Sequence, residues 1–263
     1  KYVEDYYRMN DDFDSIVGLS QIMQAEAIRF AVEAHRRNMP YCMGTLYWQF
    51  NDCWPVISWS SIDYGGNWKA LHYAARKFFS PILVSIRDLD DKIEIHVIND
   101  QHHEVESRIR LGLFNLNGDI LFKDSSEINV EPFSSTIYRA FDKNDFLSGI
   151  DLCATVFRAE LFVGGRVLSR AHQFFKRPKY LSIPSPEFDY KIERVLGKYV
   201  ITIKSKSFLC QVHLISIKVR GVFSDNYFEM LPGEVQMIDF EPSENEELKK
   251  SELIIRTLHE LMN

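Results

Sequence analysis

The feature that most constrains the fold is a change in the spacing of apolar residues at Pro81. Before Pro81, apolar residues recur at positions i, i+3 and i+4, as they do on one face of an α-helix. After it, they occur in short runs separated by turn-forming pairs such as Asn117-Gly118 and Gly164-Gly165. This pattern predicts helices in residues 1–79 and β-strands in the rest of the chain.

Residues 1–79 are predicted to contain two helices with one buried strand between them. The first helix is predicted to have Ser20 as its N-cap and to end before Pro40. Its apolar face consists of Leu19, Ile22, Met23, Ala27, Phe30, Ala31 and Ala34. Met43–Phe50 is largely apolar, as in a parallel-sheet strand that is buried on both faces, and a second helix is predicted over residues 68–79. This order is typical of the last part of a (β/α)8 barrel, although closing a barrel takes eight strands.

The runs after Pro81 are predicted to form a first immunoglobulin-like β-sandwich at residues 80–177. About seven short strands at regular spacing are typical of one antiparallel sandwich. The predicted strands are Ile82–Ile86, Ile93–Ile98, Ser107–Phe114, Ile120–Phe122, Thr136–Phe141, Cys153–Phe162 and Arg166–Phe174.

A second immunoglobulin-like sandwich is predicted at residues 178–263, after a stiff linker at Arg177–Pro186 that contains three prolines. Its predicted strands are Phe188–Glu193, Lys198–Ser205, Gln211–Val219, Val235–Phe240 and Leu253–Leu258. Apolar and polar residues alternate in the second of these strands, which predicts one face in contact with water. The charged run Glu241–Lys250 is interpreted as a solvated loop. The fold class is therefore mainly β.

The charge of the chain argues against a nucleic-acid partner. Its 31 basic and 37 acidic residues give a net charge of −6, and no basic cluster is longer than Arg36-Arg37 or Lys249-Lys250. No apolar run approaches the roughly 18 residues of a membrane span, so no membrane partner is expected. The compartment stays open.

The cysteines and histidines give no metal-binding pattern. Cys42, Cys53, Cys153 and Cys210 form no C-x-x-C pair and have no nearby histidine, which excludes ordinary zinc-finger spacing. His102-His103 and the acidic run Asp88–Asp91 are interpreted as turns, because the latter lacks the glycine and terminal glutamate of a calcium loop. We therefore expect no metal and no cofactor.

All four tryptophans, Trp48, Trp54, Trp59 and Trp68, lie within 21 residues. An indole ring offers a flat apolar face that matches the C–H face of a sugar, and its N–H can donate to a hydroxyl. The polar residues among the tryptophans are Gln49, Asn51, Asp52, Ser58, Ser60 and Asp63. Composition leaves two interpretations open: a sugar-binding surface, or an aromatic core beneath a domain junction. Their place after a predicted strand favours binding, because functional residues gather at the C-terminal ends of parallel strands.

Two long segments resemble β-mannosidases of glycoside hydrolase family 2. Residues 47–64, YWQFNDCWPVISWSSIDY, are similar to the last barrel strand and the loop after it, and the similarity continues through residues 68–73 and upstream at 20–26. Residues 224–234, SDNYFEMLPGE, are similar to the signature of the C-terminal immunoglobulin-like domain of the same enzymes.

The resemblance implies a larger parent with five domains, in which residues 1–79 end the catalytic barrel and two sandwiches follow. The chain begins at Lys1 without methionine, and we expect it to be a piece of that parent. Enzymes of this family are retaining and use one carboxylate as nucleophile and another as acid/base. The motifs that hold these two residues do not occur here, so no catalytic residue is assigned and the chain alone is expected to be inactive. Glu4 and Glu26 are the early carboxylates considered, and Glu26 is interpreted as structural.

The resemblance also implies which residues bind substrate. Trp48 matches the family tryptophan that forms the floor of the sugar site, and Asn51, Asp52 and Trp54 match the adjoining loop. The partner of the parent would be a mannose-containing oligosaccharide with a terminal β-mannosyl residue. The periplasm suits a bacterial glycan-degrading enzyme of this kind and is placed ahead of the lysosome. The other two tryptophans, Trp59 and Trp68, are interpreted as structural, as is Asp63.

Two other functions stay open: a galactoside- or glucuronide-hydrolysing relative, and a free-standing sugar-binding or adhesion module. Because residues 1–79 would be covered in a complete barrel, we expect them to expose apolar surface. That surface is expected to dock on the first sandwich or to mediate self-association. The resemblance suggests a cis peptide bond at Trp48–Gln49, but we expect trans where most of the barrel is absent.

Overall fold

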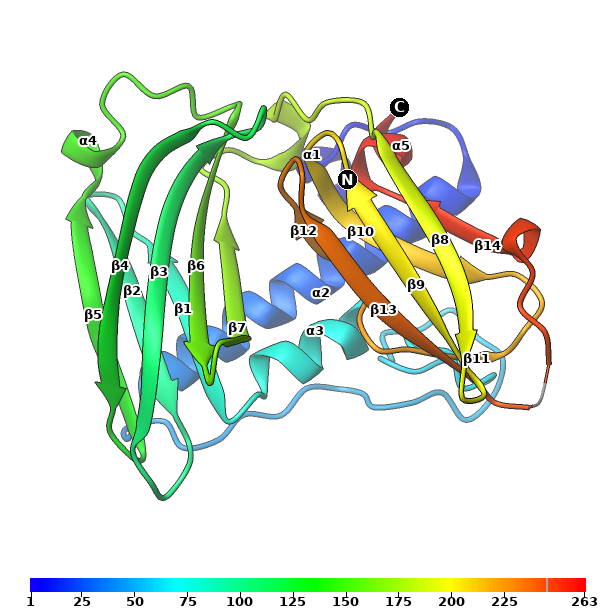
Figure 1. The fold of residues 1–263 in the computed structure, drawn as a ribbon, viewed down its shortest axis with the longest axis horizontal. Coiled ribbons are helices and arrows are strands. Elements are labelled where there is room, and N and C mark those ends of the chain that lie inside the picture. Colours follow the sequence, from blue (N-terminus) through cyan, green and yellow to red (C-terminus); the bar gives the residue numbers. More distant parts are fainter. Residues whose placement is uncertain (245) are drawn as a thin grey trace.

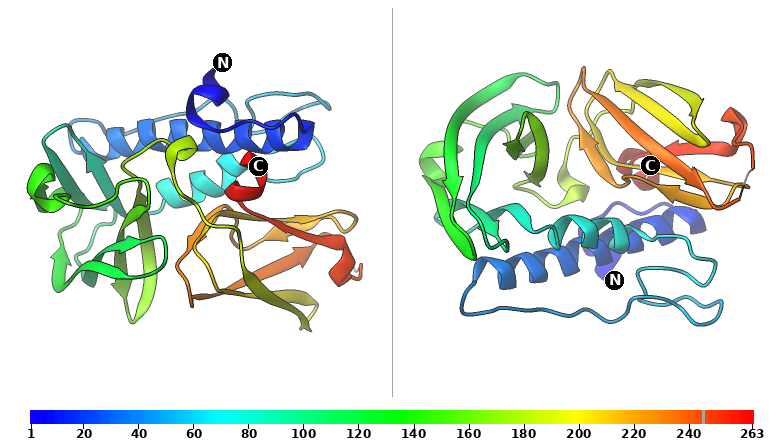
Figure 2. Two further views of the ribbon diagram at one scale, coloured as in Figure 1. Left: turned by 90° about the horizontal axis from the view of Figure 1, so that it is seen from above. Right: turned by 60° about the horizontal axis from the view of Figure 1, so that its bottom comes forward.

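The computed structural model describes residues 1–244 and 246–263, in which two β-sandwiches stand side by side on a layer of helices (Figure 1). The long helix α2 (Phe13–Arg37) passes beneath both sandwiches, and α3 (Ala70–Phe78) lies next to it (Figure 2). The remaining helices are short: α1 (Tyr2–Tyr6), α4 (Lys143–Phe146), α5 (Leu258–Met262) and the 3-10 turns η1 (Pro178–Tyr180) and η2 (Lys250–Glu252). None of these described helices is both long and apolar enough to cross a membrane.

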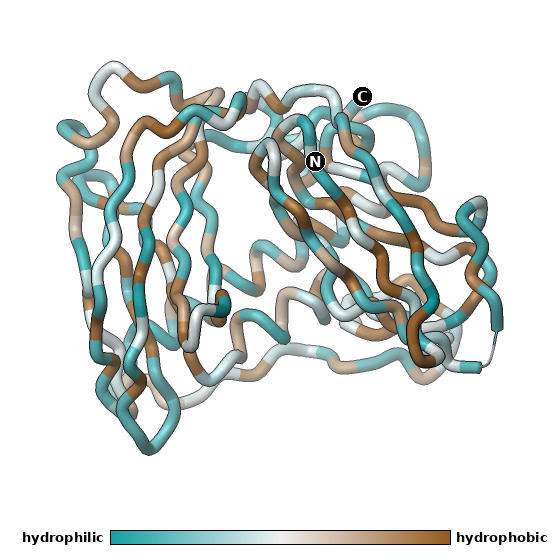
Figure 3. The backbone as a smooth tube through the Cα atoms, viewed as in Figure 1, coloured by the Kyte–Doolittle hydropathy of each residue, from teal (hydrophilic) through white to brown (hydrophobic). Residues whose placement is uncertain are grey.

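The first sandwich packs the sheet β1-β2-β5 against the sheet β4-β3-β6-β7. Its strands are β1 (Ile82–Asp88), β2 (Lys92–Asn99), β3 (Val105–Asn115), β4 (Ile120–Val130), β5 (Ser134–Asp142), β6 (Thr155–Val163) and β7 (Arg166–Gln173). All seven predicted strands are confirmed, and β4 is eight residues longer than its predicted end. Alternate residues of the strands point inward, so that apolar and polar stretches alternate along them (Figure 3).

The second sandwich packs the sheet β11-β13-β9-β8 against the sheet β12-β10-β14. Its strands are β8 (Phe188–Val195), β9 (Lys198–Ser205), β10 (Leu209–Ser216), β11 (Gly221–Phe223), β12 (Phe228–Met230), β13 (Val235–Pro242) and β14 (Leu253–Arg256). The five predicted strands are confirmed, while β11 and β12 escaped prediction because three residues show no periodicity. Tyr199, Ile201 and Ile203 of β9 are buried and the residues between them are not, as the alternation predicted.

Two predictions for the connecting segments need correction. The linker at 177–186 is packed, because Leu181 and Ile183 are buried in a cluster with α2 and both sandwiches. The charged run at 241–250 is only partly a loop, since β13 extends to Pro242 and Leu248 is buried in the second core. Asn245 of that run lies outside the described residues.

Helix α2 begins well before the predicted N-cap. The carboxylate of Asp12 accepts a hydrogen bond from the backbone N–H of Ser15 at 2.9 Å, which caps the helix at Phe13. Ser20 lies inside the helix, where its hydroxyl donates to the carbonyl of Val17 at 2.8 Å. The Ser20 cap is therefore wrong, because the first two turns of α2 carry exposed apolar side chains that hide the helical period. The second predicted helix is confirmed as α3.

The predicted strand Met43–Phe50 does not form. Residues 38–69 run as a long loop, and their only β-type pairings are isolated bridges that join Asn51 to Ile62 and Ile62 to Trp68. A strand needs a neighbour along its whole length, whereas here only the end of the segment, Gln49 and Phe50, is paired with Ser61 and Ile62, and Leu46 is 98% exposed. The Trp48–Gln49 peptide bond is cis, so the expectation of a trans bond is also wrong.

Candidate functional site

The candidate site is the segment of residues 38–69 that carries the tryptophans, here named the tryptophan loop. It leaves the end of α2, crosses the outer side of the helical layer and returns to the start of α3 (Figure 2). The backbone N–H of Asp52 donates to the carbonyl of Ile62, and that of Ser61 donates to the carbonyl of Gln49, each at 3.0 Å. The side chain of Gln24 on α2 donates to the carbonyl of Trp59 at 2.7 Å. The loop is therefore held to itself and to the helix beneath it.

The hydroxyl of Ser61 organises the inner side of the tryptophan loop. It donates to the carbonyl of Phe50 at 2.8 Å, and it lies 3.0 Å from the hydroxyl of Tyr47 and 3.1 Å from Nδ1 of His72. Because a hydroxyl has a single proton, Ser61 accepts from both of these neighbours. His72 therefore carries its proton on Nδ1. Burial, and after it the charge of Arg76, lower the pKa of His72, which keeps the ring neutral at pH 7.

Asp52 does not face solvent but serves as an anchor inside the tryptophan loop. Its carboxylate accepts a short hydrogen bond from Ser58 and an ion pair from Nζ of Lys69 at 3.1 Å. Nζ of Lys69 also donates to the hydroxyl of Ser60 at 2.8 Å. The hydrogen bond from Ser58, followed by those of Ser60 and Lys69, lowers the pKa of Asp52 and keeps it ionised. Both carboxylate oxygens are engaged within the loop, so this residue holds the loop in shape.

The other three predicted substrate-binding residues lie at the surface. The side chains of Trp48 and Trp54 are 75% and 61% exposed, and Asn51 is exposed as well, with its amide donating to the carbonyl of Asp52 at 3.1 Å. Trp48 and Trp54 thus offer flat apolar faces to solvent in the same loop, with a polar group between them in the sequence. This arrangement can bind a sugar ring by its C–H face.

The residues interpreted as structural divide into two groups. Asp63 accepts from the backbone and the side chain of Asn67 at 2.9 Å and so closes a turn, and Trp68 packs edge-on against His72 and Tyr73. Trp59 differs, because its side chain is exposed and only its carbonyl is held.

The expectation that the first 79 residues expose apolar surface is confirmed. Nine large apolar side chains of the tryptophan loop are well exposed: Tyr41, Met43, Leu46, Trp48, Phe50, Trp54, Ile57, Trp59 and Tyr64. Large apolar side chains exposed in such number on one segment are typical of an interaction site. The loop can therefore meet a ligand, a protein surface or both.

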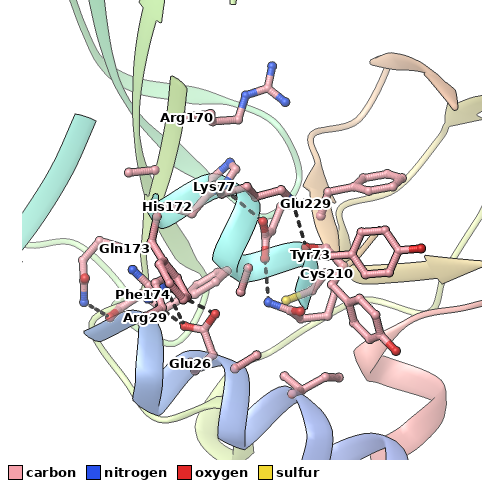
Figure 4. Close-up of a pocket in the computed structure, with 18 of the residues that line it drawn as sticks. Glu26, Arg29, Tyr73, Lys77, Arg170, His172, Gln173, Phe174, Cys210 and Glu229 are labelled. Carbon is pink, nitrogen blue, oxygen red and sulfur yellow. Dashed lines mark hydrogen bonds and ion pairs between the residues drawn. The ribbon is translucent and has the colours of Figure 1, made fainter. Parts of the chain in front are cut away.

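A cavity elsewhere in the molecule escaped the sequence analysis. A cavity of about 840 Å³ lies where α2, α3, β7 and the second sandwich meet, and it is lined by charged and aromatic side chains (Figure 4). Glu26 lies on its wall in an ion pair with Arg29 at 2.7 Å, which agrees with its structural interpretation. Glu4 is exposed and lies 3.4 Å from the N-terminal amine. No sequence signal foretold the cavity, because its lining comes from segments far apart in the chain.

Comparison with known proteins assigns both sandwiches. Residues 91–180 match the family model of the mannosidase Ig/CBM-like domain, and residues 183–261 match that of an Ig-fold domain of mannosidases. The β-mannosidase A of Emericella nidulans is 26% identical over 97% of this chain, and the β-mannosidase of Capra hircus is 28% identical over 91%. The crystal structure of the β-D-mannosidase of Dictyoglomus thermophilum superposes with a TM-score of 0.87 over 97% of the chain, at 26% identity.

The chain therefore corresponds to a partial C-terminal region of β-mannosidases, and its two sandwiches match the domain models of mannosidases. The family resemblance that residues 47–64 and 224–234 carry is thereby confirmed. The chain spans about 30% of the length of these β-mannosidases: 30% of the Emericella protein, 29% of the Capra protein and 31% of the Dictyoglomus chain.

Proposed function

We propose that this chain is the non-catalytic C-terminal part of a retaining β-mannosidase, which hydrolyses terminal non-reducing β-D-mannosyl residues. The proposal rests on the names of the relatives and on one structural observation, the exposed indole faces of Trp48 and Trp54 in the tryptophan loop. We divide the chain into residues 1–79, the end of a (β/α)8 barrel, and two sandwiches at 80–177 and 178–263.

In the proposed parent, the tryptophan loop forms one wall of the sugar site. Trp48 supplies the apolar floor, and Asn51 and Trp54 lie at its edge, where an amide and an indole N–H can meet hydroxyl groups. Asp52 acts through the loop: its ion pair with Lys69 fixes the segment from which Trp48 projects. The exposed apolar residues of the loop are the surface that the rest of a barrel would cover.

Catalysis requires groups from elsewhere in the parent. A retaining glycosidase needs two carboxyl groups roughly 5–5.5 Å apart, one of them free to attack the sugar. Glu26 is neutralised by Arg29, and Glu4 is an exposed residue of the short helix α1. We therefore assign both catalytic carboxylates to the part of the parent outside this chain.

The test compares two proteins on one substrate. The purified chain should release no p-nitrophenol from p-nitrophenyl β-D-mannopyranoside above buffer, while the longer protein that contains it should turn the mannoside over. In the longer protein, Trp48→Ala should raise KM, whereas Trp59→Ala serves as a matched control. Turnover of the matching galactoside or glucuronide in preference to the mannoside would contradict the assigned substrate. Mannoside hydrolysis by the chain alone that disappears in Glu26→Gln would overturn the non-catalytic assignment.

The exposed tryptophans also suit a second function, that of a free-standing sugar-binding module. Such a module would retard the isolated chain in a gel that contains mannan, and Trp48→Ala would remove the retardation. No retardation is expected from the parent-enzyme proposal, because a single wall of a site gives little affinity. Sedimentation velocity tests self-association through the tryptophan loop, and dimers that persist in Leu46→Asp would exclude this face as the contact.

A further inference from the structure

The two sandwiches are joined by a buried polar network that passes through one histidine. Arg158 of β6 and His172 of β7 belong to the first sandwich, while Glu229 of β12 and Glu234 of the turn before β13 belong to the second. The Arg158 guanidinium donates two hydrogen bonds to the carboxylate of Glu234, one of them at 3.1 Å. Nδ1 of His172 lies 3.1 Å from the carboxylate of Glu229. Both glutamates lie in the 224–234 segment, whose role neither the tryptophan loop nor the proposed function explains.

The hydrogen bonds fix the protonation state of His172. Nε of Arg158 lies 2.8 Å from Nε2 of His172. A guanidinium N–H can only donate, so Nε2 must be the unprotonated, accepting nitrogen. The ring proton is therefore on Nδ1, from which it is donated to Glu229 (Figure 4). In this arrangement a neutral His172 links a cation of its own sandwich to an anion of the other.

A second proton on His172 would break this arrangement. Nε2 would then carry hydrogen, lose its bond from Arg158 and place a positive charge 2.8 Å from that guanidinium. The side chains of Arg158 and His172 are 4% and 10% exposed, so water gives the two cations little screening. The attraction of His172 to Glu229 would grow, but the same carboxylate already receives a hydrogen bond from Gln211 at 3.1 Å.

The charged surroundings of His172 come from every element packed around the network. Two cations, Arg158 and Arg170, and one anion, Glu229, act on the ring itself, while Lys77 and Arg29 approach Glu229 from the helices. The charged and titratable groups around the network include Arg158 and Glu160 of β6, Arg170 of β7, Glu26 and Arg29 of α2, Lys77 of α3, Cys210 of β10, Glu229 of β12 and Glu234. Burial, opposed in part by Glu229, lowers the pKa of His172, so the ring is neutral at pH 7.

A cavity at the interface between the sandwiches gives solvent protons access to His172. The cavity of about 840 Å³ reaches both His172 and Glu229, so protons can arrive from solvent (Figure 4). The apolar contacts between the sandwiches form one cluster, which includes Leu116 and Val156 from the first and Phe208 and Leu231 from the second. The connecting segment at 181–183 is buried in the same cluster and would become accessible if the sandwiches parted.

We propose that His172 is a proton-operated latch between the two sandwiches, closed while the ring is neutral and loosened when the ring binds a second proton. The closed form binds fewer protons than the open form at pH values below about 6.5, the ordinary pKa of histidine. Opening is therefore favoured progressively as the pH falls from there to the pKa of His172 in the closed form. Each unit between the two pKa values increases the opening equilibrium about tenfold.

The test uses the 263-residue chain, labelled with ¹⁵N-histidine, and its variant His172→Gln. A glutamine can accept from Arg158 with its amide oxygen and donate to Glu229 with its amide nitrogen, but it cannot titrate. Hydrogen exchange of residues 177–186 and 228–234 is measured from pH 7.5 to 4.5, after correction for the intrinsic pH dependence. His103→Gln, at an exposed site outside the network, serves as the control.

We expect NMR to show the Nδ1–H tautomer of His172 at pH 7.5, and exchange of both segments to rise at least tenfold on acidification in the unmodified chain and in His103→Gln. The rise should be absent from His172→Gln. An equal rise in His172→Gln, an Nε2–H tautomer, or a ring already charged at pH 7.5 would overturn the proposal. If His172→Gln does not fold, the unmodified chain decides: an exchange step that coincides with protonation of His172 supports the latch, and a separate step overturns it.

Discussion

Arg36 joins three parts of the molecule, and its removal should release the helical layer from the first sandwich. One terminal nitrogen of its guanidinium donates to the carbonyls of Phe78 and Ser80 at 2.6 and 2.7 Å. The other donates to the carboxylate of Asp100 at 2.7 Å. Phe78 is the last residue of α3, where a carbonyl has no partner within the helix, and Asp100 follows β2. A single side chain thus ties α2, α3 and the β2 edge together.

The expected cost of Arg36→Met follows from these contacts. A hydrogen bond from a charged donor contributes about 1.5–3 kcal/mol, and an acceptor left buried without a partner costs about 1–3 kcal/mol. The pair with Asp100 adds little, because that carboxylate is 45% exposed. The two carbonyl bonds therefore give a loss of about 3 kcal/mol, which corresponds to a roughly 150-fold increase in local opening.

Hydrogen exchange of α3, followed by mass spectrometry, measures this opening without requiring that the whole chain unfold in one step. Arg8→Met is the matched control, since exposed Arg8 donates one hydrogen bond, to the carbonyl of Lys179 at 2.9 Å. The control should change exchange less than tenfold. If α3 in Arg36→Met exchanged within about threefold of the unmodified chain, the assignment of this side chain as the tie would be refuted.

Two further perturbations test other parts of the structure. Burial lowers the pKa of His213 to about 4, and because this is below the ordinary 6.5, stability should fall by about 3 kcal/mol as the pH drops from 6.5 to 4. His213→Phe preserves the stacking on Tyr227 but cannot titrate. The free energy of unfolding in urea should therefore differ between pH 7 and pH 4 by about 3 kcal/mol less in this variant than in the unmodified chain. An equal difference in the two proteins would contradict the neutral, buried state of His213. Lys69→Met should leave Asp52 without its cation and make the backbone of residues 49–62 exchange roughly tenfold faster, with α3 little affected. Lys179→Met, at a site outside the loop, provides the control, and equal effects of the two substitutions would show that Asp52 does not anchor the loop.

The sequence was most informative where neighbours along the chain decide the structure. Every predicted strand of the two sandwiches is present, because side-chain alternation records which face of a strand is buried. Helix α3 was also predicted, because its apolar residues follow the period of a helix. The cap of α2 was misplaced, because Phe13 and Ile16 are exposed apolar residues at the start of the helix and do not follow the buried face.

The sequence proposed a site in the tryptophan loop, but it did not predict which way each side chain of that loop points. The clustering of tryptophans and the family resemblance both pointed to residues 48–54, and Trp48 and Trp54 are exposed there. Asp52 was placed with them as a substrate-binding residue, yet its carboxylate faces Ser58 and Lys69. Which way a side chain points in an irregular loop depends on partners up to 17 residues away, and no periodicity records such partners.

The sequence itself thus determined where the strands of the two sandwiches and the N-terminal helices lie along the chain, and it contains a motif shared with β-mannosidases. The tertiary structure alone decided that Met43–Phe50 is a loop and that Arg158 and His172 meet Glu229 and Glu234. The physical reason is the range of the interactions. Burial patterns repeat every two or 3.6 residues, whereas these contacts join residues more than 50 positions apart and exist only after the sandwiches have packed together.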